Sequence, residues 1–159
     1  MTLKVGDKLP NTDLMEMTQS GPSKVSSADL FGGKKVAMFA VPGAYTPTCS
    51  AKHLPGFIAN LDVLKAKGVD SIICLSVNDP FVMAAWGKDQ NAGEVRMIAD
   101  PDGAFTKAMQ LEFDASGAGL GIRSRRYSMV AEDGVVSVLN LEETGGFEVS
   151  DAETLVGQI

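Results

Sequence analysis

Short apolar runs separated by polar breaks alternate with stretches of helical spacing along this chain. Each apolar run is predicted to be a strand, the first two of them buried and the first one central. They lie at residues 36–41, 71–77 and 95–99. Met15 and Met17 alternate with polar neighbours, which is a weaker strand signal within the entry region 1–35.

Helices are predicted between and after these runs. The stretch that follows the first run has apolar residues at helical spacing, at Leu54, Phe57, Ile58, Leu61 and Leu64. We expect one helix there, with a kink near Pro55 and an end at Gly68. Asn78-Asp79-Pro80 predicts a second helix, because a capping side chain precedes proline at the first helical position. Ser26 is predicted to cap a single helical turn, and residues 150–153 form a capping box that opens a C-terminal helix.

The C-terminal part of the chain predicts a hairpin. Residues 126–131 and 135–141 flank Glu132-Asp133-Gly134, which is a strong hairpin signal, and residues 114–122 form a glycine-rich loop. No repeat or linker interrupts the pattern, so residues 1–159 are expected to form a single domain. The order of elements predicts an α/β fold with a central mixed sheet and helices on both faces.

Composition and charge exclude several classes of protein. Hydrophobic residues make up 45% of the chain and charged residues 21%, as in an ordinary globular protein. The net charge of −6 gives no electrostatic basis for binding nucleic acid or an anionic membrane. No apolar run approaches the ~20 residues of a membrane-spanning helix, and the N-terminus lacks the apolar core of a signal peptide. We therefore expect a cytoplasmic protein, unless an organellar targeting segment has been removed.

Few residues are available for metal or disulfide chemistry. Cys49 and Cys74 are the only cysteines, and His53 is the only histidine. Two cysteines are too few for a disulfide scaffold and fit a reducing compartment. No spacing of cysteine and histidine matches a zinc site, so we expect no metal and no cofactor.

Cys49 follows the first apolar run after a polar break, at the point where a helix is predicted to begin. Unpaired backbone N–H groups and the helix dipole favour a thiolate at such a position. A lone cysteine is more often a buried structural residue, but the polar, turn-forming neighbours of Cys49 argue against that interpretation. Residues 46–49 have the spacing of a redox Cys-x-x-Cys motif with threonine in the first place. The Thr46 hydroxyl cannot close a disulfide, but it can donate and accept hydrogen bonds to an oxygen-containing substrate.

The pattern Pro42-x-x-x-Thr46-x-x-Cys49 resembles the signature of the peroxiredoxins. The fuller stretch 41–50 closely resembles the Prx5 branch, which includes plant type II enzymes and their bacterial relatives. The similarity continues through residues 52–57, 76–83 and 123–129, and so covers nearly the whole chain. The resemblance implies a thioredoxin-like fold and thiol-dependent reduction of hydrogen peroxide and organic hydroperoxides.

The resemblance also implies catalytic roles. Cys49 would be the peroxidatic cysteine, whose thiolate attacks one peroxide oxygen and becomes a sulfenic acid. Charge then builds on the leaving oxygen, so preorganised donors matter more than a strong base. By resemblance, the donors are the Thr46 hydroxyl, the backbone N–H groups of Thr48 and Cys49, and an arginine. Pro42 and Pro47 are expected to shield the sulfur and fix the geometry of the loop.

The arginine must be chosen from three, at positions 123, 125 and 126, which would otherwise indicate a solvated face or an anion-binding patch. The arginine of the family directly precedes an aromatic residue, which selects Arg126, before Tyr127. A guanidinium there can stabilise the thiolate and orient the peroxide. His53, one helical turn after the reactive cysteine, is either a general base or a packed, hydrogen-bonded side chain, and we favour a supporting role.

Two ways of reducing the oxidised sulfur remain open. Cys74 lies mid-strand between Ile73 and Leu75 and is expected to be an inert core residue. Alternatively, it is a resolving cysteine that pairs with Cys49 after local unfolding, with thioredoxin as the reductant. Some Prx5 members carry a resolving cysteine near the C-terminus, but residues 141–149 contain none. We favour a one-cysteine cycle with glutathione or glutaredoxin as the reductant.

By resemblance, we also expect a homodimer whose interface uses Tyr45, Pro47, Thr48 and Phe81. Two other functions compete with the peroxidase. A thiol–disulfide oxidoreductase is disfavoured because the Cys-x-x-Cys pair is missing. A non-enzymatic peroxide sensor would use oxidation of Cys49 as a signal.

Overall fold

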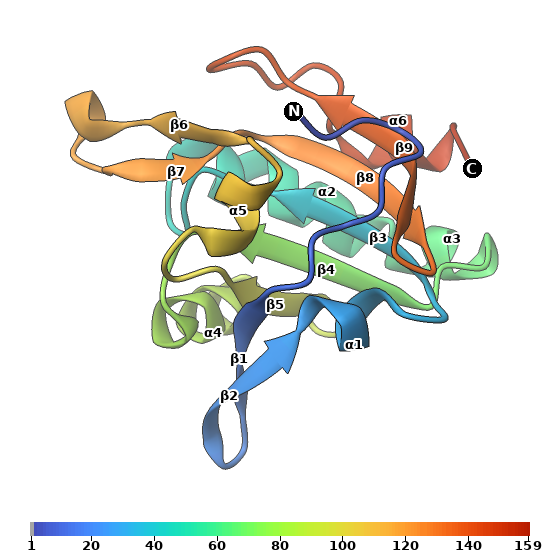
Figure 1. The fold of residues 1–159 in the computed structure, drawn as a ribbon, viewed down its shortest axis with the longest axis horizontal. Helices are drawn as coiled ribbons and strands as arrows, with labels where there is room; N and C mark the ends of the chain where they lie inside the picture. Colours follow the sequence, from blue (N-terminus) through green and yellow to red (C-terminus); the bar gives the residue numbers. More distant parts are fainter. Residues whose placement is uncertain (1) are drawn as a thin grey trace.

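A seven-stranded mixed sheet forms the centre of the computed structural model, which describes residues 2–159 (Figure 1). The strand order is β2-β1-β5-β4-β3-β8-β9, and the short pair β6–β7 forms a separate arm. The strands are β1 Asp13–Thr18, β2 Gly21–Ser26, β3 Lys35–Ala40, β4 Ser71–Ser76, β5 Arg96–Ala99, β6 Glu112–Asp114, β7 Ile122–Ser124, β8 Tyr127–Glu132 and β9 Val135–Leu141. The helices are α1 Ser27–Phe31, α2 Leu54–Ala59, α3 Leu61–Ala66, α4 Pro80–Asp89, α5 Ala104–Ala108 and α6 Ala152–Val156.

The middle of the sheet consists of the three strands predicted from the apolar runs. β3 pairs with β4 and β4 with β5 in parallel, whereas β8 runs antiparallel to β3 and β1 runs antiparallel to β5. Central parallel strands are covered on both faces, which explains their almost continuous apolar sequences. The predicted hairpin is also confirmed, because β8 and β9 pair antiparallel around the Asp133-Gly134 turn.

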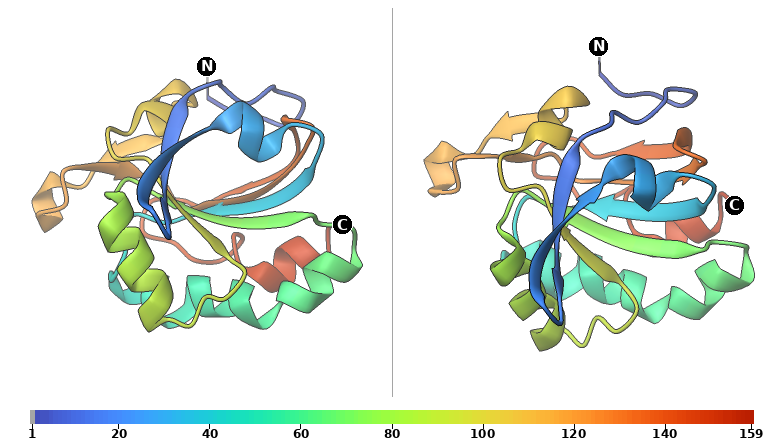
Figure 2. Two further views of the ribbon diagram at one scale, coloured as in Figure 1. Left: turned by 90° about the horizontal axis from the view of Figure 1, so that it is seen from below. Right: turned by 60° about the horizontal axis from the view of Figure 1, so that its bottom comes forward.

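Helices cover both faces of the sheet, as predicted (Figure 2). On one face, α1 and α5 supply Leu30, Phe31 and Phe105 to an apolar core. On the other face, α2, α3, α4 and α6 supply a second core, and Cys49 and Cys74 both belong to it. The reactive-cysteine region therefore packs on one defined face of the sheet.

The helical stretch after Cys49 differs from the single kinked helix that we predicted. It begins as a π-helix at Cys49–His53, continues as α2, and breaks at Asn60 before α3. The chain does not break at Pro55, which lies in α2 just after the π-helical turn and has helical backbone before it. The Asn60 side chain instead donates a hydrogen bond of 2.8 Å to the Gly56 carbonyl, and such local side-chain bonds compete with a continuous helix.

The cap of the C-terminal helix needs correction, and the glycine-rich loop has a context that we did not predict. Asp151, rather than Ser150, caps α6: its carboxylate accepts a hydrogen bond from the Thr154 amide at 3.0 Å. The glycine-rich loop 114–122 is the tip of the arm formed by β6 and β7, whose strands of 3 residues each are too short to give a periodic signal. The caps by Ser26 and Asp79 are confirmed by their hydrogen bonds to backbone amides.

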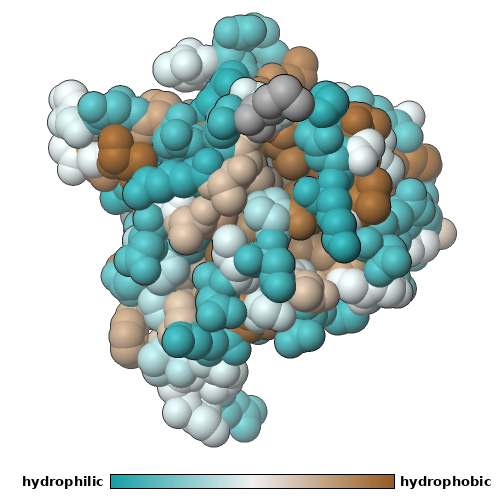
Figure 3. Space-filling model, viewed as in Figure 1, coloured by the Kyte–Doolittle hydropathy of each residue, from teal (hydrophilic) through white to brown (hydrophobic). Residues whose placement is uncertain are grey.

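The surface is largely hydrophilic on the face drawn in Figure 3, and its apolar side chains form separate patches. In the part of the chain that the structure describes, no helix is long and apolar enough to cross a membrane.

Candidate active site

Cys49 lies at the start of the π-helix, one loop after the end of β3. The chain leaves the sheet at Val41, whose amide still donates to the Leu75 carbonyl at 3.0 Å. The indole N–H of Trp86 in α4 donates to the Ser50 hydroxyl at 3.0 Å and so anchors the first turn. The Cys49 side chain is fully buried, so access to its sulfur depends on the loop that precedes it.

The loop between β3 and Cys49 is held by close backbone contacts. The Thr46 hydroxyl donates to the Gly43 carbonyl at 2.7 Å, and Arg123 Nη1 donates to the Pro42 carbonyl at 3.2 Å. A Cβ at position 43 would lie 2.8 Å from Arg123 Nη1 and 3.1 Å from Thr46 Cγ2, so one of these side chains would have to shift to accommodate it. The amide of Ala44 donates to Asn78 Oδ1 at 3.0 Å, which ties the loop to the segment before α4.

Arg126 reaches Cys49 from just before β8. Its Nη2 lies 3.1 Å from Cys49 Sγ, and its Nη1 lies 2.9 Å from His53 Nδ1. The other two arginines of the sequence cluster bond elsewhere: Arg123 to the Leu120 and Pro42 carbonyls, and Arg125 to the Glu142 carbonyl. Of these three guanidiniums, the structure therefore places Arg126 against the sulfur.

His53 is a neutral imidazole with a defined tautomer. Arginine can only donate, so Nδ1 is the acceptor from Arg126, and Nε2 carries the proton that is donated to the Ser150 carbonyl at 2.9 Å. Burial and the positive charge of Arg126 lower the pKa of His53 to about 3. An imidazole already engaged at both nitrogens is placed to hold Arg126 rather than to act as a base.

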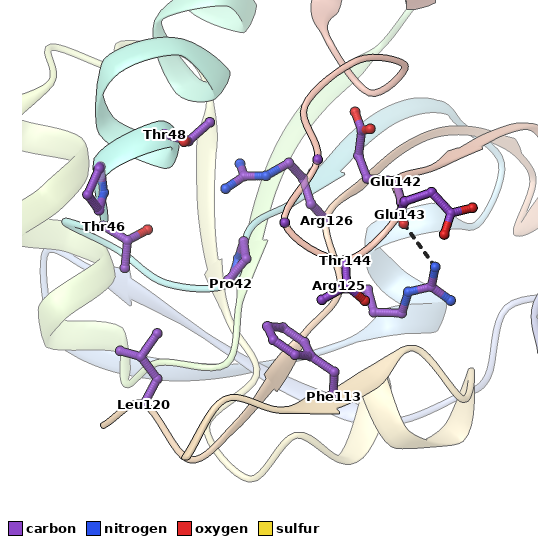
Figure 4. A pocket seen from close by; sticks show the side chains of 13 residues that line it. Pro42, Thr46, Thr48, Phe113, Leu120, Arg125, Arg126, Glu142, Glu143 and Thr144 are labelled. Carbon is purple, nitrogen blue, oxygen red and sulfur yellow. Dashed lines mark hydrogen bonds between the residues drawn. The ribbon is translucent and has the colours of Figure 1, made fainter. Parts of the chain in front are cut away.

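A pocket of about 330 Å³ opens beside the loop (Figure 4). It is lined by Pro42, Thr46, Pro47, Thr48, Phe113, Leu120, Arg125, Arg126 and residues 142–146. In Figure 4 the Arg126 side chain extends across the pocket toward Thr48. The buried Cys49 side chain is not part of the wall, so a small molecule in the pocket meets Thr46, Thr48 and Arg126 first.

A protein-family model described as Redoxin matches residues 4–156. Peroxiredoxin-2E, chloroplastic, of Arabidopsis thaliana is 50% identical over 160 residues, which cover 98% of this chain and 68% of the relative. Peroxiredoxin-2C of Oryza sativa subsp. japonica is 49% identical, over 96% of this chain and 95% of the relative.

The chain belongs to the peroxiredoxins. Solved structures agree with this assignment. Reduced Prx3 of Vibrio vulnificus in complex with H2O2 superposes with a TM-score of 0.96 at 53% identity, covering 99% of each chain. Peroxiredoxin 5 of Alvinella pompejana superposes with a TM-score of 0.86 at 35% identity, covering 97% of this chain and 96% of that one. The protein is therefore a thiol peroxidase of the Prx5 type with a thioredoxin-like fold, which acts on peroxides with thiol reductants.

The second cysteine of this peroxiredoxin is fully buried in β4. Cys74 is paired in register with Phe39 of β3 and Met97 of β5, and burial raises the pKa of its thiol well above the ordinary value. Both cysteines are free thiols. Cys74 shares an apolar core with Cys49 but lies in a central strand.

The residues expected at a dimer interface lie beside the active-site loop. Tyr45 is 51% exposed and Phe81 is 62% exposed, although both are large apolar side chains. Tyr45 has a positive φ of 64°, and its hydroxyl donates to Asp89 in α4 at 2.6 Å. Pro47 is exposed and Thr48 is half-buried.

Sequence reasoning missed several residues at the site. Phe147 packs on His53 with ring centroids 5.0 Å apart, and the Arg126 guanidinium lies 5.8 Å from the centre of the same ring. Glu142 and Ser150 fix the loop that carries Phe147. The sequence offers no local signal for Glu142, because the amides that bond its carboxylate converge on it only in the folded chain. In residues 2–159, no group of histidine, cysteine, aspartate and glutamate is placed to hold a metal ion.

Proposed function

We propose that Cys49 is the peroxidatic cysteine of this thiol peroxidase. The observation that carries the proposal is the 3.1 Å contact between Arg126 Nη2 and the buried Cys49 sulfur. The Cys49 thiolate attacks one oxygen of the peroxide, so that an S–O bond forms while the O–O bond breaks. The second oxygen leaves with the electron pair, takes up a proton and becomes water or an alcohol. Cys49 is left as a sulfenic acid.

Arg126, Thr46 and the first turn of the π-helix stabilise this reaction. Arg126 neutralises the thiolate and then faces the charge that develops on the peroxide. The Thr46 hydroxyl is oriented by its bond to the Gly43 carbonyl, which leaves its oxygen free to accept the proton of a hydroperoxide. The backbone N–H groups of Thr48 and Cys49 complete the donors, and Pro42 shields the sulfur. His53 supports Arg126.

The cycle closes with an external thiol, glutathione or glutaredoxin. One thiol condenses with the Cys49 sulfenic acid to form a mixed disulfide and water. A second thiol then releases the Cys49 thiol and carries away the disulfide. We disfavour an internal disulfide with Cys74, because that thiol is fully buried in β4, which pairs with β3 and β5 on its two sides, whereas a disulfide needs the two sulfurs to come within bonding distance.

Steady-state peroxidase assays test both parts of this proposal. Cys49→Ser is expected to abolish turnover with every reductant. Cys74→Ser is expected to keep wild-type turnover with glutathione and glutaredoxin, on hydrogen peroxide and on an alkyl hydroperoxide. Full loss of turnover in Cys74→Ser, together with efficient reduction of the wild type by thioredoxin, would establish the two-cysteine cycle instead.

We further propose that the enzyme is a cytoplasmic homodimer. Tyr45, Pro47, Thr48 and Phe81 form its interface, and the exposure of two aromatic side chains beside the active-site loop supports this assignment. Two free thiols suit the reducing cytoplasm, although the name of the Arabidopsis relative places that protein in the chloroplast.

A further inference from the structure

The buried carboxylate of Glu142 gathers several hydrogen bonds at the end of β9. Its Oε2 accepts from the amides of Glu148, Val149 and Ser150 at 2.8 Å each, and from the Ser150 hydroxyl at 2.7 Å. Its Oε1 accepts a further bond from the Glu148 amide at 3.0 Å. These contacts fold segment 142–150 back on itself and fix the position of Ser150.

No cation neutralises this carboxylate among residues 2–159. The ion pairs of the described chain lie elsewhere, and Arg125 bonds the backbone carbonyl of Glu142 instead of its side chain. Burial acts to raise the pKa of Glu142, but the amide and hydroxyl donors outweigh it and lower the pKa. Glu142 therefore serves as an ionised acceptor, and such charge-assisted bonds are stronger than neutral ones.

The far end of the folded segment meets the catalytic arginine. The Ser150 carbonyl accepts the His53 Nε2 proton at 2.9 Å, and His53 Nδ1 in turn faces Arg126 Nη1 at 2.9 Å. Phe147, from the same segment, packs against His53 and Arg126. A continuous path of bonds thus joins Glu142 to the guanidinium that contacts Cys49.

We propose that Glu142 is a positioning residue of the peroxidase reaction, which acts through Ser150 and His53 to hold Arg126 on the Cys49 sulfur. The inference rests on the proposed catalytic roles of Cys49 and Arg126. Support of this kind is needed because the outer part of the segment, at 143–145, is exposed and lines the pocket, and it includes a glycine. The carboxylate holds the amide and the hydroxyl of Ser150, whose carbonyl faces His53.

Three variants separate this role from a general loss of structure. Glu142→Ala removes all the acceptor atoms and is expected to lower the second-order rate with hydrogen peroxide about tenfold, less than the ~100-fold loss of a direct donor. Glu142→Gln keeps one carbonyl oxygen for the amides and is expected to recover most of the rate. Glu148→Ala is the matched control, because its exposed side chain is removed while its amide remains.

Nitrogen-15 NMR reports the tautomer of His53, which should not change if Glu142 only stabilises the fold. His53 is the only histidine, so its ring signals are unambiguous. The wild type is expected to show the Nε2–H tautomer and no titration above pH ~4, in line with its lowered pKa of about 3. In Glu142→Ala the two tautomers are expected to mix, because the Ser150 carbonyl no longer holds the Nε2 proton in place.

The rate and the His53 signals must change together. A folded Glu142→Ala with a wild-type rate overturns the proposal, and so does a rate loss in either Glu142 variant with unchanged His53 signals. If Glu142→Ala does not fold, two other results test the proposal: the rate and His53 signals of Glu142→Gln, and the His53 tautomer of the wild type. An Nδ1–H tautomer in the wild type would refute the proposal, because Nδ1 could then not accept a hydrogen bond from Arg126. A wild-type peroxide rate in Arg126→Gln would refute the proposed role of Arg126 itself. If Arg126→Gln loses the rate but Glu142→Ala keeps it, only the positioning role of Glu142 is refuted.

Discussion

Arg126 Nη2 lies 3.1 Å from Cys49 Sγ, although the two residues are 77 positions apart in the sequence. The contact arises because β8, which begins at Tyr127, pairs antiparallel with β3, and β3 delivers the chain to the loop before Cys49. Tyr127 is opposite Ala40, at the end of β3, so the residue before β8 emerges beside that loop. Register in the sheet thus sets the distance between the sulfur and the guanidinium.

Arg126→Gln is expected to slow the reaction with hydrogen peroxide by at least ~100-fold, because it removes the charged donor nearest the sulfur. Stopped-flow kinetics on the reduced enzyme measure the second-order rate. Arg96→Gln is the matched control: Arg96 pairs with Glu16 and does not contact the site, so its rate should equal that of the wild type. Equal rates for the two variants would contradict the role of Arg126.

The free energy of unfolding is expected to depend on pH through His53. Its pKa is about 3 in the folded protein, against ~6.5 for an ordinary histidine in the unfolded chain. Between these pH values the unfolded chain binds a proton at His53 that the folded protein does not bind. The contribution of His53 to the free energy of unfolding is therefore complete above pH ~6.5 and is lost as the pH falls. From pH 6.5 to pH 5 the loss amounts to about 2 kcal/mol.

Urea unfolding at pH 7, 6 and 5 measures this dependence. His53→Gln keeps one acceptor and one donor but cannot titrate, so its stability should fall less steeply toward pH 5 than that of the wild type. The difference between the two proteins isolates His53 from the carboxylates, which titrate in both. Parallel curves would show that His53 is protonated in the folded protein as readily as in the unfolded chain.

Gly43→Ala is expected to reduce the peroxidase rate about tenfold, because small displacements of reacting groups are costly. The added Cβ would lie 2.8 Å from Arg123 Nη1 and 3.1 Å from Thr46 Cγ2, so the loop or its partners must shift. Gly117→Ala is the control, since a Cβ at position 117 meets nothing within 4 Å. Peroxide kinetics on the two variants should therefore differ, and a wild-type rate in Gly43→Ala would show that the loop position does not matter.

Phe81→Ser is expected to shift the protein from dimer to monomer at micromolar concentration in sedimentation velocity. Phe81 is 62% exposed in the single chain, and burial of its ring against a second copy would provide apolar area for association. Val135→Ser changes another exposed apolar side chain, 41% exposed at the start of β9, and should leave the dimer intact. A wild type that sediments only as a monomer would refute the dimer itself.

The sequence by itself determined the central strands, most of the helix caps and the motif that places a cysteine after a strand. Buried parallel strands, the Asp79 cap and the hairpin turn each leave a local pattern, because the physical cause acts between residues close in sequence. The break at Asn60 was missed, because the bond from its side chain to the Gly56 carbonyl leaves no periodic trace in the sequence.

Only the tertiary structure decided which groups meet at the sulfur. Arg123, Arg125 and Arg126 have the same chemistry, and although the family resemblance selected Arg126, their spacing alone cannot tell which guanidinium the register of β8 brings to Cys49. Likewise, Glu142 looks like any surface glutamate until the chain turns and its amides converge on the carboxylate. Local patterns encode elements, whereas the electrostatic setting of the thiol depends on contacts between distant residues, which exist only once the sheet is assembled.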